Sequence, residues 1–158
     1  MKRKIKYISF LIMAVVTLSL SSCLKDNLKD YPLFDTNEIT LVNVEHRYNG
    51  TATMNGQPVV AYQKLNVTQT INKDAGTINV VISVPAATTS FPAAEKAKVS
   101  QTKLWFYLNI STAATIAPAD GTPALGDPTD ATKPLKYIVK AANGATRTWT
   151  INVTAFNP

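Results

Sequence analysis

The residues of this sequence best suited to bind a ligand lie in one run, residues 103–110. Its even positions carry aliphatic side chains or Phe, which is typical of a strand that faces a core, and its odd positions carry Trp105, Tyr107 and Asn109. Two aromatic rings on the outer face could stack on sugar rings, with Asn109 bonded to sugar hydroxyls. The alternative, which we favour, is a packed central strand covered by Ala-rich loops or by a neighbouring hairpin.

Groups that could support catalysis are few. The only histidine, His46, lies in the polar half of a predicted strand without a serine or cysteine motif, so we expect a solvated strand residue. Asp120, Asp127 and Asp130 could form a carboxylate pair that hydrolyses glycosidic bonds, or could bind calcium. They lie, however, in a Pro- and Gly-rich loop that contains ordinary turn dipeptides. We therefore predict no catalytic residues, no metal site, no cofactor and no enzyme activity.

A different chemistry is predicted at Cys23, the only cysteine. It follows a basic start and a short apolar run, and Leu20-Ser21-Ser22-Cys23 resembles the bacterial lipobox. In that motif the thiol is diacylated and the cysteine becomes the new N-terminus after cleavage. The alternatives are an uncleaved anchor or a free thiol. The sequence thus predicts a signal peptide over residues 1–22 and attachment to a membrane through lipidated Cys23.

Cleavage before Cys23 also changes the net charge. Four of the 16 basic residues lie in the signal segment, so the chain from Cys23 carries a net charge of +2 instead of +6. A charge this small is not that of a nucleic-acid-binding protein, and we predict no nucleic-acid partner.

Residues 23–38 are predicted to be the lipidated cysteine and a tether. Its first part, Leu24-Lys25-Asp26-Asn27-Leu28-Lys29-Asp30, resembles the tags that direct Bacteroidota lipoproteins to the outer face of the outer membrane. The alternative is a solvated linker without an address. The resemblance implies a lipid-anchored outer-membrane protein exposed at the cell surface.

Residues 39–158 are predicted to form one all-β domain, because short apolar runs alternate with period two and no ten-residue stretch has a helical period. One hairpin is predicted in detail. Pairing Ile71 with Ile78 and Val67 with Ile82 leaves a four-residue loop, in which Gly76 takes the left-handed last position.

A second hairpin is predicted near the end of the chain. A two-residue Asn-Gly turn would mix apolar and polar side chains on one face, so we reject it. A three-residue loop, Ala142-Asn143-Gly144 with a left-handed glycine, instead pairs Tyr137 with Trp149 and Leu135 with Ile151.

Further strands are predicted at residues 39–48, 59–64 and 104–111, joined by the variable connections 86–100 and 113–133, with at most one helical turn at 92–97. Six or more strands over about 120 residues favour two sheets packed face to face, an Ig-like β-sandwich that needs no disulfide.

Two segments of the chain resemble a known family. The first is Ile71-Asn72-Lys73 through Val84-Pro85, followed by Ile110-Ser111 and Ala114-Thr115-Ile116-Ala117-Pro118 with Gly121; the second is the closing hairpin, Pro134 to Gly144 and Arg147 to Val153. They resemble the Ig-like, cadherin-like domains of unknown function in Bacteroidota cell-surface lipoproteins, often associated with polysaccharide uptake. Residues 39–62 depart from that pattern by an extra polar hairpin around Asn49-Gly50 and Asn55-Gly56.

The resemblance implies a fold and a location but no catalytic residues. We expect a non-catalytic accessory or structural module that makes protein contacts in an outer-membrane complex. The alternative is a glycan-binding module that takes part in polysaccharide uptake through Trp105, Tyr107 and Asn109.

Overall fold

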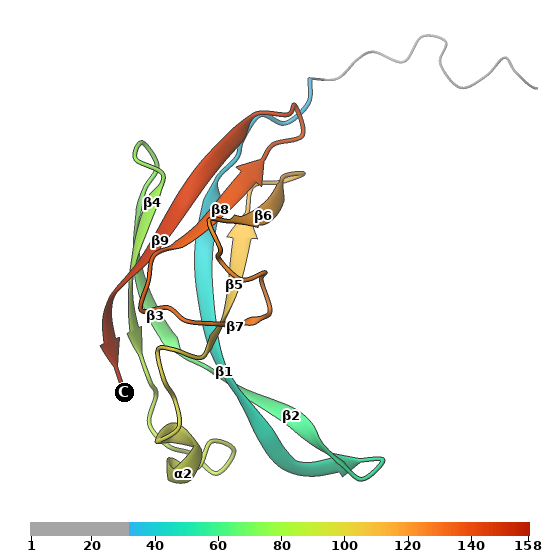
Figure 1. Ribbon diagram of the computed structural model, residues 1–158, viewed down its shortest axis with the longest axis vertical. Helices are drawn as coiled ribbons and strands as arrows, with labels where there is room; N and C mark the ends of the chain where they lie inside the picture. Colours follow the sequence, from blue (N-terminus) through green and yellow to red (C-terminus); the bar gives the residue numbers. More distant parts are fainter. Residues whose placement is uncertain (1–31) are drawn as a thin grey trace, which may run out of the picture. The chain divides into compact units, whose positions relative to one another are not determined.

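The computed structural model describes residues 32–158, of which Leu33–Pro158 form one compact unit built from two β-sheets (Figure 1). The signal peptide, Cys23 and most of the predicted tether lie outside the described residues. None of the helices in the described part is long and apolar enough to cross a membrane.

The first sheet has four strands in the order β2-β1-β5-β7, and all neighbours are antiparallel. Its strands are β1 (Ile39–Met54), β2 (Gln57–Lys64), β5 (Leu104–Ile110) and β7 (Pro128–Thr129). Strand β1 is 16 residues long, and its second half forms a hairpin with β2 that projects beyond β5 (Figure 1).

The second sheet has five strands in the order β3-β4-β9-β8-β6. They are β3 (Asn66–Asn72), β4 (Thr77–Ser83), β6 (Thr115–Ala119), β8 (Leu135–Lys140) and β9 (Thr146–Asn157), and β4 pairs with β9 in parallel. One helical turn, α2 (Ala93–Lys96), lies in the connection between β4 and β5. The predicted all-β sandwich is thereby confirmed.

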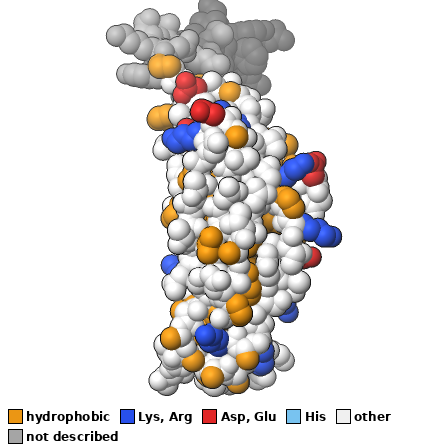
Figure 2. All heavy atoms as spheres, turned by 90° about the vertical axis from the view of Figure 1, so that its left-hand side faces the viewer, with side chains coloured by type: hydrophobic (Ala, Val, Ile, Leu, Met, Phe, Trp, Pro, Cys, Tyr) orange, Lys and Arg blue, Asp and Glu red, His pale blue; other side chains and the backbone are white. Residues whose placement is uncertain are grey.

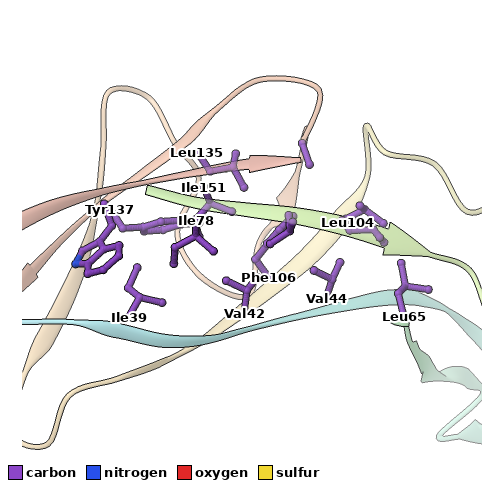
Figure 3. Close-up of a cluster of buried hydrophobic side chains, with 14 of the residues drawn as sticks. Ile39, Val42, Val44, Leu65, Ile78, Leu104, Phe106, Leu135, Tyr137 and Ile151 are labelled. Atoms are coloured by element: carbon purple, nitrogen blue, oxygen red, sulfur yellow. The ribbon is translucent and has the colours of Figure 1, made fainter. Parts of the chain in front are cut away.

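The core lies between the two sheets, and Figure 3 shows side chains from both that point toward one another. Fully buried Tyr137 and Trp149 are its largest members. Burial raises the pKa of Tyr137 to about 12, because the phenolate would have to leave water. The Trp149 indole N–H donates to the carbonyl oxygen of Asn37 at 2.9 Å, so a polar atom in the core has a partner.

The outward side of the second sheet is mostly polar but carries few charges. Figure 2, which views the molecule from the side of β4 and β9, shows charged side chains chiefly near its margins and ends. Asn and Thr side chains bond across the strands there, as between Asn152 and Asn79 at 3.3 Å. This face is therefore hydrated through short neutral side chains.

Both predicted hairpin registers are confirmed. Ile71 pairs with Ile78 and Val67 with Ile82, while Tyr137 pairs with Trp149 and Leu135 with Ile151. The loops close as predicted, with Gly76 at φ +63° and Gly144 at φ +92°, and the amide of Ala141 donates to the carbonyl oxygen of Ala145 at 2.8 Å.

The first strand is longer than predicted, because Asn49-Gly50 is not a turn. Gly50 does not have positive φ, and Asn49 pairs with Val60 of β2 inside the strand. The reversal occurs at Asn55 and Gly56, with φ +50° and +76°. An Asn-Gly dipeptide is therefore extended at residues 49–50, where β2 pairs with it, and forms the turn at residues 55–56.

Strands β6 and β7 were not predicted, since both lie in the segment 113–133 that the sequence assigns to a connection. Pro118 of β6 pairs with Tyr137 of β8. Strand β6 is at the edge of the second sheet, where a residue without an N–H is tolerated. The predicted helical turn is present as α2.

We predict that Gly76→Ala is more destabilising than Gly56→Ala. Both glycines have positive φ, but a Cβ at position 76 would lie 2.7 Å from the Thr148 carbonyl oxygen, whereas nothing lies within 4 Å of one at position 56. We expect losses of about 2–4 and about 1 kcal/mol in the free energy of unfolding, measured in urea. Equal losses would show that left-handed strain alone sets the cost.

Candidate functional site

The structure places Trp105, Tyr107 and Asn109 on one side of β5, as predicted, while Leu104 and Phe106 point into the core. Exposure rises along the strand: Trp105 is only 9% exposed, Tyr107 is half-buried and Asn109 is exposed. An open stacking surface therefore does not exist at Trp105.

Arg47, a residue of β1, covers the two aromatic rings. Its guanidinium carbon lies 5.9 Å from the ring centroid of Trp105 and 5.5 Å from that of Tyr107. It also donates a hydrogen bond to the Tyr107 hydroxyl, and its Nε lies 3.8 Å from a carboxylate oxygen of Glu45. The cover thus comes from the strand that leads into the extra hairpin, and cation–π attraction holds it in place.

A cleft of about 540 Å³ lies where β1 continues past the start of β5. Its walls come from β1, from Val60 of β2, from the segment around α2 and from the residues that open β5. The lining residues are His46, Arg47, Tyr48, Asn49, Val60, Glu95, Lys98, Lys103 and Trp105. The β1–β2 hairpin and the segment from α2 to the start of β5, which are distant in sequence, therefore bring cations, aromatic rings and one carboxylate to the same place.

The prediction that His46 is a solvated residue is wrong, because its side chain is buried and only 6% exposed. His46 shares the core-facing side of β1 with Val42 and Val44. Its ring stacks on Tyr48 with centroids 5.8 Å apart and lies 6.3 Å from the ring of Phe91. The alternation with Val42 and Val44 was a signal for burial, but the polar neighbours Glu45 and Arg47 masked it.

Both ring nitrogens of His46 are buried and have no hydrogen-bond partner among residues 32–158. Burial is the main cause that lowers the pKa of His46 below 6.5. The positive charges of Lys103 and Lys98 lower the pKa further, and the carboxylate of Glu95 acts in the opposite direction. At neutral pH the imidazole is therefore uncharged.

The charges around the cleft are only partly compensated. Lys98 forms a 2.7 Å ion pair with Glu95, while Lys103 forms no ion pair within the described part of the chain. The lining residues carry three positive side chains against one carboxylate.

Two of the three aspartates considered for catalysis or calcium, Asp120 and Asp130, have side-chain partners in the fold, whereas Asp127 bonds only through its backbone among the described residues. Asp120 is in a turn with φ +50° and forms an ion pair with Lys136 at 2.7 Å. Asp130 accepts hydrogen bonds from the backbone and hydroxyl of Thr132, which lower its pKa.

The β1–β2 hairpin presents a second feature, the exposed apolar side chains of Met54, Val59, Val60 and Tyr62, which we together call the hairpin surface. Val60 and Tyr62 lie on one face of β2 and Val59 on the other. Met54, Val60 and Tyr62 are 69%, 61% and 59% exposed. Strand β2 lies at the edge of its sheet, so one row of its backbone groups is unpaired by that sheet. The sequence predicts a polar hairpin; in the structure the hairpin instead exposes several large apolar side chains.

The hairpin is joined to the body through Tyr48, whose hydroxyl donates to the carbonyl oxygen of Ser90. A second hollow of about 370 Å³ lies between the hairpin and the segment that precedes α2, lined among others by Gly50, Val59 and Pro92. The hairpin therefore stands partly away from the core.

These features define an all-β sandwich with an open hairpin and a basic cleft at its base. The sequence profile of the DUF5018-related family matches residues 39–152, and the chain belongs to that family. The fold is similar to the crystal structure of a Bacteroides fragilis protein that is thought to be secreted, with 39% sequence identity and a TM-score of 0.74. That match covers 80% of this chain and 100% of the other. No curated protein matches the chain.

We predict that His46→Phe makes the protein more stable and flattens its pH dependence. The folded state depresses the pKa of His46, so above pH 6.5 its titration costs no stability. As the pH falls from 6.5 toward the folded-state pKa, only the unfolded state gains the proton and the free energy of unfolding decreases. Removing two unpaired buried nitrogens should raise the free energy of unfolding at pH 7 by about 1 kcal/mol.

The measurement is urea unfolding of both proteins between pH 7.5 and pH 5. All other titrating groups are shared, so the difference between the two curves reports His46. Parallel curves would mean that His46 titrates alike in the folded and unfolded states.

Proposed function

We propose that this protein is a cell-surface lipoprotein, anchored in the outer membrane through Cys23, whose sandwich is a non-catalytic module that makes protein contacts through the hairpin surface. The observation that carries the proposal is the concentration of exposed apolar side chains on one edge hairpin. Monomeric proteins rarely leave such a surface uncovered without a binding role.

The edge position of β2 supports a specific mode of contact. Edge strands are commonly protected by Pro or Lys, and here Pro58 and Lys64 lie near the ends of β2 while the segment between them has neither. A partner strand could pair with these backbone groups, while side chains such as Val60 and Tyr62 supply specificity.

The geometry of the described domain fits an anchored protein. Leu33, where the compact unit begins, and the turn at Asn55 and Gly56 lie at opposite ends of the domain (Figure 1). Contacts near Leu33 fix the chain to the body, since Phe34 accepts from the amide of Asn143 at 3.1 Å and the amide of Glu38 donates to the Ser111 hydroxyl at 2.9 Å. An upstream anchor would therefore be joined to the end of the domain that does not carry the hairpin turn. The Bacteroides fragilis relative, thought to be secreted, supports export.

Anchoring is tested by Cys23→Ala, with Ser22→Ala as the matched control that keeps a small residue beside the cysteine. We expect metabolic labelling with palmitate and recovery in the membrane fraction for the native protein and for Ser22→Ala, and loss of both for Cys23→Ala. Protease digestion of intact cells then reports whether the domain faces outward. Equal labelling of all three would contradict the lipidation of Cys23.

Protein contact is tested with a photoreactive amino acid at position 60, and with one at Ile138 of β8, an exposed apolar position in the other sheet. We expect discrete crosslinked products in cells from position 60 only. Val60→Asp should weaken co-purification of that product at least about tenfold, and Ile138→Asp should not. Crosslinking that is equal at both positions would contradict a specific role for the hairpin.

Glycan binding is the second candidate function, because Trp105 lines the cleft together with Tyr48 and Asn49. A glycan array probed with the protein and with Trp105→Ala tests it. Saturable binding that is lost in Trp105→Ala would favour this function over protein contact.

A further inference from the structure

We propose that the cleft at the base of the hairpin binds an oxyanion, a carboxylate or sulfate group carried by a small organic ligand. This site is distinct from the hairpin surface proposed for protein contacts, although Val60 belongs to both. The proposal rests on an excess of positive charge in a concave site and on a buried histidine in its wall whose ring nitrogens have no hydrogen-bond partner among residues 32–158.

Three cations meet in this cleft, one from β1 and two from the connection between β4 and β5. Arg47 comes from β1, Lys98 follows α2, and Lys103 precedes β5. Glu95 forms an ion pair with Lys98, and Glu45 lies beside Arg47. Lys103 has no carboxylate partner in residues 32–158. Mutual repulsion among cations in a concave site is relieved by an anion that enters it.

His46 adds a second, independent indication. A neutral imidazole presents one donor and one acceptor, and groups of this kind that are buried in folded proteins are nearly always hydrogen-bonded. Neither nitrogen has a partner among the described residues, although the ring belongs to the cleft wall. An oxyanion accepts hydrogen bonds from N–H groups. Burial is the main cause that lowers the pKa of His46, and the negative charge of an anion would offset the smaller contribution of the two lysines.

The remaining walls indicate that the anion is part of a larger organic molecule. Trp105, Tyr48 and Val60 offer apolar contact, and about 540 Å³ exceeds the space that an inorganic ion occupies. The expected ligand therefore combines one negatively charged group with an apolar face. A free cation would be repelled by the excess of positive side chains, and an uncharged hydrocarbon would leave those side chains without an anionic partner.

The single histidine of the chain makes the test direct, because its imidazole resonances need no assignment when the protein carries no histidine tag. The purified protein is titrated with sodium benzoate, sodium sulfate or inorganic phosphate at constant ionic strength, with chloride as the balancing anion. We expect saturable shifts of the imidazole signals, with benzoate binding more tightly than sulfate or phosphate because of its ring.

The titration also predicts a change in the pKa of His46. The charged groups facing its surroundings are Glu45 and Arg47 from β1, Glu95 and Lys98 from the α2 segment, and Lys103 from the segment before β5. A bound anion opposes the two lysines, so the pKa of His46 must rise when benzoate is present. A shift of the signals without a rise in pKa would contradict binding beside the lysines.

Lys103→Gln is the test variant, since Lys103 is exposed and forms no ion pair within residues 32–158. Affinity for benzoate should fall about tenfold, while Lys103→Arg should retain it and Lys140→Gln, which removes an equal charge from β8, should leave it unchanged. Equal losses for Lys103→Gln and Lys140→Gln, or shifts that do not saturate, would overturn the proposal.

Discussion

The alternation of side chains along β1 is the constraint on which the rest of the structure depends. In its first half, Val42 and Val44 enter the core while β5 pairs on one side. A β-bulge between Ile39 and Leu41 shifts the phase so that Ile39 also points inward. In the second half, the same inner side carries His46 and Tyr48 past the start of β5, where Phe91 from the segment before α2 packs against them. One periodicity thus builds both the core and the wall of the cleft.

Local register could be predicted from the sequence because the interactions that set it are local. In the hairpins β3–β4 and β8–β9, a shift of one residue would expose Ile78 or Trp149, so the apolar pattern permits one pairing. The two-sheet architecture followed from the number and spacing of such runs. The same reasoning failed at Asn49-Gly50, because a turn dipeptide remains extended when a partner strand pairs with it.

The cleft could not be predicted, since part of its lining comes from a connection with no periodic signal. Phe91, Lys98 and Lys103 lie in the connection between β4 and β5, and only tertiary packing brings them to His46. The polar residues Glu45 and Arg47 made the strand look solvated. Arg47 in fact buries part of its length over Trp105 and Tyr107, and long cationic side chains often cover apolar surface in this way.

The two proposed sites share residues, and this has a thermodynamic consequence. Val60 belongs to the hairpin surface and also lines the cleft, and it pairs with Asn49, another lining residue. A strand added to β2 would fix the hairpin relative to the α2 segment, to which it is joined through Tyr48 and Ser90. If fixing the hairpin changes the affinity of the cleft for an anion, the anion must change the affinity for the partner strand by the same factor. Pairing of a partner strand with β2 and binding of an anion in the cleft would therefore be coupled at the base of the hairpin, where β1 leaves the core.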